Sequence, residues 1–282
     1  MEPLLQVRNL AIRYRSAEAA PHDAVVGVSF DVVRGEVLGV MGESGCGKTS
    51  IALALLGLLS REDADISGSV MFRGENLLAL NEKALQKIRG AAISMVYQEP
   101  GIALSPVMRV GTQIAEIVRA HRGQNWKKCR EEAFAMLARV GLPSTERIFS
   151  AYPHQLSGGQ LQRIVLAQAL VCEPALVIAD EPTAALDAQS RADFVSLLRE
   201  LKRSLGISLL LISHTPEIQA SLADRMIVMK GGAIVEMGRF EDLYLKPTHP
   251  YTKALLARTA TPALRPEGDR SSAAREHLVE TL

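Results

Sequence analysis

The sequence predicts an α/β fold whose strand and helix pattern is interrupted by an all-helical insert, and three observations support this. A strand-like run, a glycine-rich loop and a helix follow one another over residues 37–59, the order of a phosphate-binding α/β unit. Two apolar runs, Leu176–Ala179 and Ser208–Ser213, are typical of buried parallel strands joined by a crossover helix. Between Leu104 and Cys172 the apolar residues recur at helical spacing instead.

The expected elements follow in chain order. Strands rich in Val, Ile and Phe, several of them bounded by Gly or Pro, are predicted at Leu5–Tyr14, Val25–Val33, Val37–Met41, Ser69–Phe72 and Ile93–Tyr97. Helices are predicted at Lys48–Leu59 and Ala188–Arg203. Met226–Met229 and Ala233–Glu236 are predicted to form a hairpin across two glycines. Residues 259–282 are charged and small, so we expect a mobile tail there.

Composition limits the class of protein. At roughly 100–200 residues per domain, 282 residues allow one large domain or a core with a subdomain. A net charge of +1 argues against nucleic acid or an anionic membrane as the main partner. Three widely spaced cysteines suggest a reduced, cytoplasmic setting. A membrane span needs about 20 mostly apolar residues. The longest apolar run, Ile51–Leu59, is much shorter, so we expect no membrane-spanning helix.

A phosphate site is predicted after the strand Val37–Met41, where Gly42–Thr49 fits the pattern GxxxxGK[ST]. Glycine lets the backbone bend so that successive N–H groups face phosphate oxygens. Lys48 would neutralise the β- and γ-phosphates, and the Thr49 hydroxyl would ligate Mg²⁺. The residues expected to hold the nucleotide here are Gly42, Glu43, Ser44, Gly45, Cys46, Gly47, Lys48, Thr49 and Ser50.

Two carboxylates end the apolar strand Leu176–Ala179. Ligands gather at the carboxyl ends of strands in open α/β sheets, which is where Asp180 and Glu181 fall. Asp180 is expected to hold Mg²⁺, and Glu181 to orient or deprotonate an attacking water. An Asp-Glu pair is commonly a solvated turn, but its combination with the phosphate loop favours the functional interpretation.

A second serine- and glycine-bearing loop also opens a helix. Leu156 precedes Ser157, Gly158, Gly159 and Gln160, and a helical run to Leu170 follows. The N-terminus of a helix is a ready anion site. Two such sites mean either that one chain binds two nucleotides or that each nucleotide meets two chains.

These three motifs, in this order, resemble the ATP-binding subunit of an ABC transporter from about residue 4 to 256. The resemblance implies a P-loop NTPase core of the RecA-like type with a mixed sheet, an antiparallel β subdomain and an inserted all-helical subdomain at about 104–172. It implies one ABC ATPase domain over residues 1–258. It also implies that two such ATPases pair head to tail, so that the Ser157–Gln160 loop caps ATP held by the partner's phosphate loop.

The resemblance assigns further residues. Gln98 is similar to the Q-loop glutamine, which touches Mg²⁺ and links to the helical subdomain. His214 is similar to the switch histidine that contacts the γ-phosphate, Asp187 to the D-loop aspartate, and Tyr14 to the aromatic that stacks on adenine. The implied catalytic residues are thus Glu181, His214, Gln98 and Lys48, and the implied Mg²⁺ ligands are Thr49, Gln98 and Asp180. Thr215 departs from the acid usual after the histidine.

Residues 97–106 and the HPYT segment at about 247–256 are similar to dipeptide, oligopeptide and nickel importers. That subfamily implies a second ATPase subunit, identical or homologous, two transmembrane permease subunits and an extracytoplasmic solute-binding protein. The chain would then lie on the cytoplasmic face of the cell membrane and bind no nucleic acid. One alternative is a soluble ABC ATPase acting on DNA or ribosomes, and another is an inactive regulatory subunit. The short insert and the complete catalytic set argue against these two.

Overall fold

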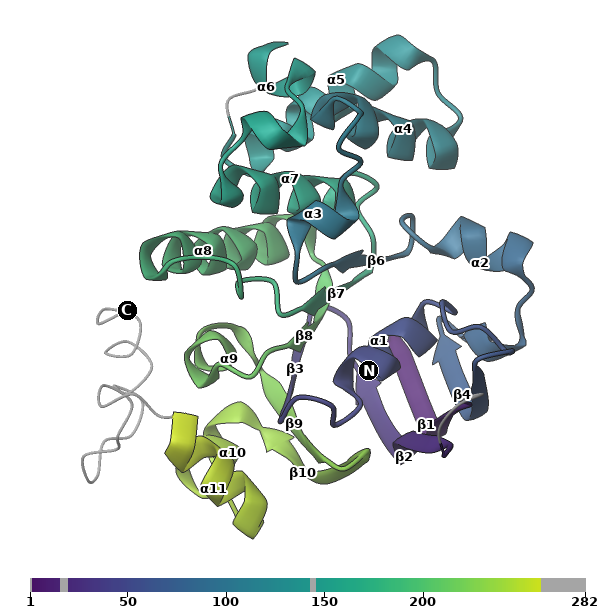
Figure 1. The fold of residues 1–282 in the computed structure, drawn as a ribbon, viewed down its shortest axis with the longest axis vertical. Coiled ribbons are helices and arrows are strands. Elements are labelled where there is room, and N and C mark those ends of the chain that lie inside the picture. Colours follow the sequence, from purple (N-terminus) through teal and green to yellow (C-terminus); the bar gives the residue numbers. More distant parts are fainter. Residues whose placement is uncertain (1, 16–19, 143–145, 260–282) are drawn as a thin grey trace. The chain divides into compact units, whose positions relative to one another are not determined.

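The computed structural model describes residues 2–15, 20–142 and 146–259, and the chain divides into two compact units (Figure 1). Unit 1 contains Met1–Ala79 and Leu210–Leu282, and unit 2 contains Leu80–Leu209. The predicted tail, residues 259–282, lies outside the described residues except for Thr259, which ends a helix.

Unit 1 contains an antiparallel sheet with the strand order β2-β1-β4-β5. Its strands are β1 (Leu5–Tyr14), β2 (His22–Val32), β4 (Ala64–Phe72) and β5 (Glu75–Asn76). Leu5 lies opposite Val32 on β2 and Phe72 on β4, and all three side chains are buried. Buried residues alternate along β1 at Leu5 and Val7 and again at Leu10 and Ile12, and the register shifts between these two pairs. The antiparallel β subdomain is thereby confirmed.

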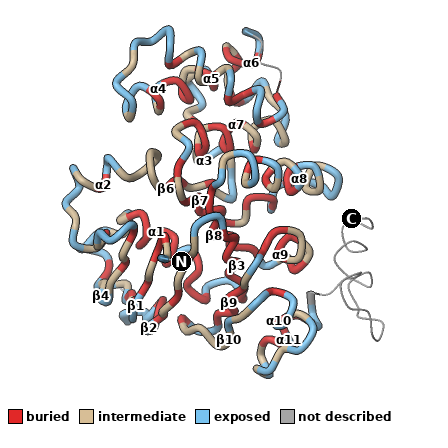
Figure 2. The backbone as a smooth tube through the Cα atoms, turned by 180° about the vertical axis from the view of Figure 1, so that it is seen from behind, coloured by how far each residue is buried: buried red, intermediate tan, exposed pale blue. Residues whose placement is uncertain are grey.

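The second sheet of unit 1 is mixed. β3 (Val37–Gly42), buried at every residue, runs parallel to β9 (Arg225–Lys230) (Figure 2). β9 pairs antiparallel with β10 (Ala233–Arg239). Gly231 and Gly232 turn the chain between them with φ of 52° and 81°, values that favour glycine. The predicted terminal hairpin is confirmed.

Four α-helices and one 3₁₀ turn accompany these sheets in the described part of unit 1. They are α1 (Lys48–Leu55), α9 (Pro216–Leu222), α10 (Phe240–Leu245), α11 (Pro250–Thr259) and the turn Leu77–Ala79. α1 ends earlier than the predicted Leu59, because Gly57 adopts a left-handed φ of 60°. The apolar pattern alone did not reveal this stop.

Unit 2 combines parallel strands with helices. β6 (Ile93–Val96) pairs with β7 (Leu176–Asp180), and β8 (Ser208–Ile212) begins in unit 2 and ends in unit 1. The helices are α2 (Glu82–Ile88), α3 (Pro100–Ala103), α4 (Val110–Arg122), α5 (Trp126–Arg139), α6 (Glu146–Ser150), the 3₁₀ turn Pro153–Gln155, α7 (Gly158–Leu170) and α8 (Ala188–Leu205).

The described residues between β6 and β7 form helices and no strand. The inserted all-helical subdomain is therefore confirmed, whereas its bounds at about 104–172 and the single domain over 1–258 stay predictions. None of the helices in the described ranges has both the length and the apolar character that crossing a bilayer requires.

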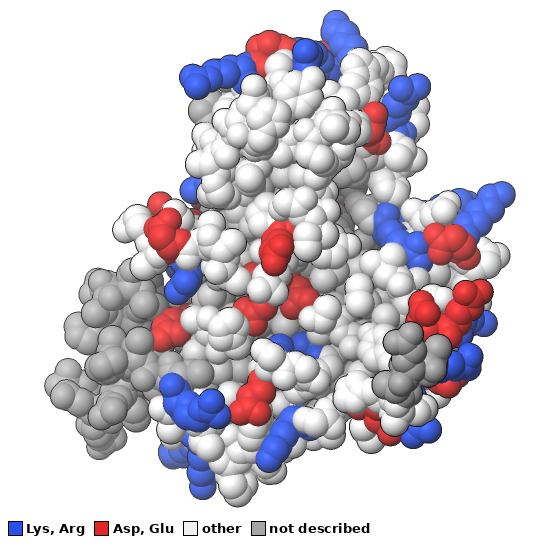
Figure 3. Space-filling model, in the orientation of Figure 1, with Lys and Arg blue, Asp and Glu red and all other residues white. Residues whose placement is uncertain are grey.

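Charged side chains of both signs are interspersed on the face drawn in Figure 3. Exposed ion pairs along the antiparallel sheet of unit 1 join Arg8 to Asp31 and Arg13 to Asp23. Exposed pairs of this kind contribute little to stability, about 0–1 kcal/mol each. Because each pair joins a positive and a negative side chain, the pairs give this sheet a surface of mixed charge.

Candidate functional site

The loop between β3 and α1 has a backbone that only glycine permits at two positions. A Cβ on Gly42 would lie 2.4 Å from the Met229 carbonyl oxygen. A Cβ on Gly47 would lie 2.2 Å from the Ala24 carbonyl oxygen, and its φ is 101°. Both contacts are shorter than a side chain allows, so the loop needs glycine to pack this close to its neighbours. The predicted strand, loop and helix are in place.

Lys48 begins α1, and its side chain folds over the loop. Its ammonium donates to the carbonyl oxygens of Gly42 at 2.8 Å and Glu43 at 2.9 Å, and the residue is only 9% exposed. A buried cation is costly unless it is hydrogen-bonded, and these carbonyls supply the partners. Neutral carbonyls are weaker acceptors for a cation than phosphate oxygens are. Lys48 is therefore placed to exchange them for an anion that enters the loop.

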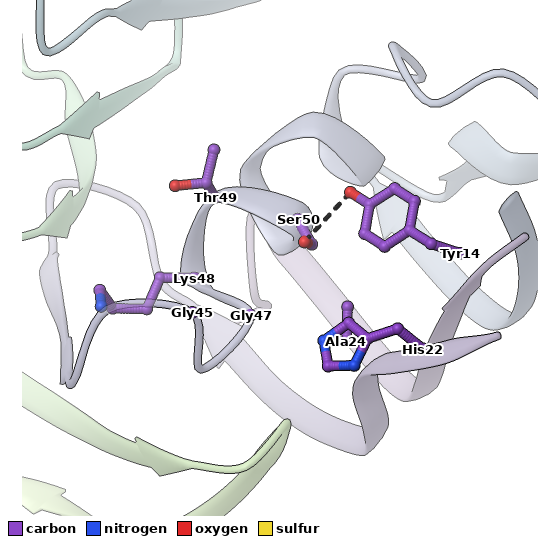
Figure 4. A pocket seen from close by; sticks show the side chains of 8 residues that line it. All are labelled: Tyr14, His22, Ala24, Gly45, Gly47, Lys48, Thr49 and Ser50. Atoms are coloured by element: carbon purple, nitrogen blue, oxygen red, sulfur yellow. Dashed lines mark hydrogen bonds between the residues drawn. The ribbon is translucent and has the colours of Figure 1, made fainter. Parts of the chain in front are cut away.

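A pocket of about 220 Å³ opens beside this loop (Figure 4). Its lining residues are Tyr14, His22, Ala24, Gly45, Gly47, Lys48, Thr49 and Ser50. The Tyr14 hydroxyl donates to Ser50 Oγ at 3.1 Å, which fixes the tyrosine side chain against α1. The predicted aromatic residue and much of the predicted phosphate loop thus line one pocket in unit 1.

His22 lines this pocket although the sequence analysis did not select it. It begins β2 and pairs with Tyr14 across the β1–β2 ladder, so the two rings enter the pocket from neighbouring strands (Figure 4). The signal that would have found it is the hairpin register, because residues opposite each other in a ladder share a face.

His214 follows β8 in unit 1. Beside it, the Thr215 N–H donates to the Ser213 hydroxyl at 3.2 Å. Thr215 stands where the ABC ATPase family usually has an acidic residue. Here the backbone N–H of Thr215 forms a local turn with Ser213 instead. The histidine itself occupies the predicted place at the end of a strand.

Gln219 is a second residue that the sequence analysis missed. It lies on α9 with no exposed surface. Its Nε2 lies 3.4 Å from the Val40 oxygen, 3.1 Å from the Leu211 oxygen and 3.3 Å from the Ser213 oxygen. Val40 lies on the strand that enters the phosphate loop, and Ser213 directly precedes the switch histidine. The Gln219 amide therefore connects β3, which enters the phosphate loop, to the end of β8.

The two predicted carboxylates lie in unit 2. Asp180 is the last residue of β7 and is 7% exposed. Glu181 follows with a φ of 46°, a left-handed conformation that is uncommon for a residue with a side chain. Strain of this kind concentrates at functional sites, where the surroundings hold it in place. Gln162 on α7 contributes to that support, since its amide donates to the Pro182 carbonyl at 2.6 Å.

The predicted second loop opens α7 through a capping box. The Ser157 hydroxyl accepts from the Gln160 N–H at 3.3 Å, and the Gln160 side chain accepts from the Ser157 N–H at 3.0 Å. Each side chain thus satisfies a backbone donor of the other. Gly158 has open space where a Cβ would be. The first turn of this helix is therefore uncovered by side chains at that point.

Gln98 and Asp187 also lie in unit 2. Gln98 is exposed two residues after β6. Asp187 is the N-cap of α8, where its carboxylate accepts from the Ser190 N–H at 2.9 Å and the Ser190 hydroxyl at 2.7 Å. The hydrogen bond from the Ser190 N–H is the main cause that lowers the pKa of the Asp187 carboxyl, and the hydrogen bond from the Ser190 hydroxyl is the second. The nucleotide and metal roles of both residues stay predictions.

The residues of each unit fit the ligands that were predicted. In unit 1, the glycine cradle, Lys48 and the start of α1 suit an anionic phosphate chain. In unit 2, the Asp180 carboxylate and the Gln98 amide are oxygen donors, the ligand type that Mg²⁺ prefers.

The ABC transporter family model matches residues 25–184. The chain is 42% identical over 257 residues to the dipeptide transport ATP-binding protein DppD of Bacillus subtilis, covering 91% of this chain and 76% of that protein. It is 39% identical over 279 residues to the oligopeptide transport ATP-binding protein OppD of Haemophilus influenzae, covering 99% and 83%.

Solved structures agree with these matches. A dimeric ATP-binding cassette in a post-hydrolysis state, bound to ADP and Pi, matches with a TM-score of 0.73 and 26% identity, covering 84% of this chain and 98% of that one. cbiO1 of Clostridium perfringens, part of the ABC transporter complex cbiONQ, matches with a TM-score of 0.73 and 26% identity, covering 87% and 92%. The chain therefore belongs to the ABC transporter family, as one of its ATP-binding subunits.

Proposed function

We propose that this ABC ATPase binds and hydrolyses Mg²⁺-ATP to energise an importer for peptides. The observation that carries the proposal is the preformed phosphate loop, in which Lys48 is buried and held by two carbonyl oxygens. Relatives named for dipeptide and oligopeptide transport support the peptide class. They give no support to the alternative of an ATPase acting on DNA or ribosomes.

Unit 1 would bind the phosphates. The loop N–H groups and the start of α1 surround the phosphate chain, and Lys48 transfers its hydrogen bonds from Gly42 and Glu43 to phosphate oxygens. Tyr14 would stack on the base. Thr49, Asp180 and Gln98 would hold Mg²⁺, which would neutralise part of the phosphate charge.

Glu181 would orient the attacking water and accept its proton. Its strained backbone supports this role, because it turns the residue away from the ordinary path of an extended strand. His214 would contact the γ-phosphate from the end of β8. Developing charge would be stabilised by preorganised donors, which need no rearrangement at the moment of reaction.

A second ATPase subunit, homologous or identical, would complete each site. The Ser157 loop opens a helix whose first residues have no covering side chain at Gly158, which suits contact with a nucleotide held elsewhere. Dimeric cassettes among the solved relatives support such a pairing. In this arrangement, the loop of one subunit caps the ATP of the other, and closure and opening of the pair drives transport.

Permease subunits would contact the segment after Gln98. Ile102 on α3 is 76% exposed and Val107 is 81% exposed, the two highest values among the large apolar side chains of the described residues. Two exposed apolar side chains five positions apart in one segment suit a surface that a partner covers. The contact would hold the chain at the cytoplasmic face of the membrane. An extracytoplasmic solute-binding protein would deliver the peptide to the permeases from the opposite face.

Two substitutions separate ATP binding from hydrolysis. Lys48→Ala should weaken Mg²⁺-ATP affinity of the intact chain in a binding titration, whereas Glu181→Gln should keep that affinity and lose phosphate release. Exposed Lys83→Ala and Glu200→Gln are the matched controls and should change neither quantity. In cells that depend on peptide uptake, Glu181→Gln should stop growth on dipeptides. Full hydrolysis by Glu181→Gln, or unchanged affinity in Lys48→Ala, would refute the proposed roles.

A further inference from the structure

The HPYT segment lies against the phosphate loop within unit 1, and we infer that Tyr251 is a positioning residue for that loop. The inference rests on the proposed function, because it takes Gly42–Thr49 as the ATP site. It assigns the segment after residue 247 a part in preparing the loop for phosphate.

The start of the segment is fixed to β10 by Glu236. The Glu236 carboxylate accepts from the Thr248 N–H and the Thr248 hydroxyl at 2.7 Å each, and from the His249 N–H at 3.2 Å. Burial alone would raise the pKa of Glu236, but the contacts with Thr252, Thr248 and His249 lower it to about 2. The carboxylate is therefore charged at neutral pH and holds the start of α11 against β10.

Tyr251, on the first turn of α11, reaches the phosphate loop. Its hydroxyl accepts a hydrogen bond from the Glu43 N–H at 3.2 Å. Burial raises the pKa of this hydroxyl, so it is neutral at physiological pH. The Tyr251 N–H in turn donates to His249 Nδ1 at 3.2 Å, which fixes the start of the helix that carries the ring.

Two cations support this arrangement. Lys230, at the end of β9, places its ammonium 4.9 Å from the centre of the Tyr251 ring, within cation–π range. Arg258, on the last turn of α11, pairs with the Glu43 carboxylate at 3.1 Å. That pair is exposed and contributes little by itself. Both ends of α11 thus contact the same loop residue.

Every polar group of Glu43 consequently has a partner. Its N–H meets Tyr251, its carboxylate meets Arg258, and its carbonyl accepts from Lys48. The loop residue next to Gly42 is held before a nucleotide arrives. A preformed loop loses less conformational freedom on binding, and this raises affinity.

The test uses the intact chain and Tyr251→Phe, which removes the hydroxyl and keeps the ring that Lys230 contacts. Losing one neutral hydrogen bond should weaken Mg²⁺-ATP affinity about threefold to tenfold. In the nucleotide-free chain, the Glu43 amide should exchange its hydrogen faster by about the same factor. The control is Tyr244→Phe on α10, another half-buried tyrosine of unit 1, which should leave both quantities unchanged.

Affinity of Tyr251→Phe within twofold of the unmodified chain would overturn the inference, whatever the amide exchange shows. An equal loss in Tyr244→Phe would also overturn it, because the effect would then belong to general packing. If the unmodified chain bound no ATP, the proposed function would fall as well. If the unmodified chain and Tyr251→Phe both bound Mg²⁺-ATP tightly, the positioning role of Tyr251 would be wrong and the proposed function would stand.

Discussion

Replacing Gln219 by Leu tests how the phosphate loop is connected to the strand that carries the switch histidine. Leucine has a similar size and no polar atom. The change removes the amide that lies between the carbonyl oxygens of Val40, Leu211 and Ser213. Position 219 has no exposed surface, so water cannot easily replace the lost donor.

The magnitude follows from the hydrogen bonds that change. The Val40 oxygen keeps a partner, since it also accepts from the Ser213 N–H at 3.2 Å. The oxygens of Leu211 and Ser213 lose this donor, and the substitution also removes the buried Gln219 Oε1, which has no partner. Losing a buried donor costs about 1–3 kcal/mol of unfolding free energy, and removing the orphaned Oε1 offsets a part. We expect a net loss of about 1–2 kcal/mol.

Thermal unfolding measures this loss. For a chain of this size, each kcal/mol lowers the unfolding midpoint by about 2–4 °C, so Gln219→Leu should melt about 2–8 °C lower. Gln189→Leu is the control, because Gln189 is exposed on α8 and bonds only within its own helix to Asp193. A midpoint for Gln219→Leu within 1 °C of the Gln189→Leu midpoint (about a quarter to a half kcal/mol) would refute the reasoning.

Two further predictions concern pH and partner binding. Because the folded pKa of Glu236 is about 2 against an ordinary 4.5, its contribution is complete above pH 4.5 and is lost as pH falls toward 2. Solvent screening limits it to about 1–2 kcal/mol. When the free energy of unfolding is measured by urea at a series of pH values, Glu236→Gln should reduce its fall between pH 4.5 and 2. The exposed control Glu75→Gln should leave that fall unchanged. An equal fall in Glu236→Gln and the unmodified chain would contradict this. Ile102→Glu together with Val107→Glu should prevent co-purification with the permease subunits and leave ATP affinity unchanged; retained co-purification would show that this surface is not the contact.

Sequence reasoning succeeded where the chemistry is local. The phosphate loop needs consecutive N–H groups and one lysine, so the whole requirement lies within Gly42–Thr49. The serine- and glycine-bearing loop that opens α7 and the carboxylates that end β7 are equally short patterns. Helix ends were less predictable, and α1 stops at Leu55 because of the backbone conformation of Gly57. The helices α2, α9 and α10 were not predicted, because six or seven residues carry too little periodicity.

By itself, the sequence determined the motifs, their order and the α/β class, since each depends on residues within a few positions of one another. Only the tertiary structure decided which distant residues support the loop. Tyr251 lies 208 positions from Glu43, and Gln219 lies 179 positions from Val40. Such contacts depend on strand order and on the packing of helices against strands. No single stretch of sequence encodes that arrangement, because it arises only when the buried strands are brought side by side.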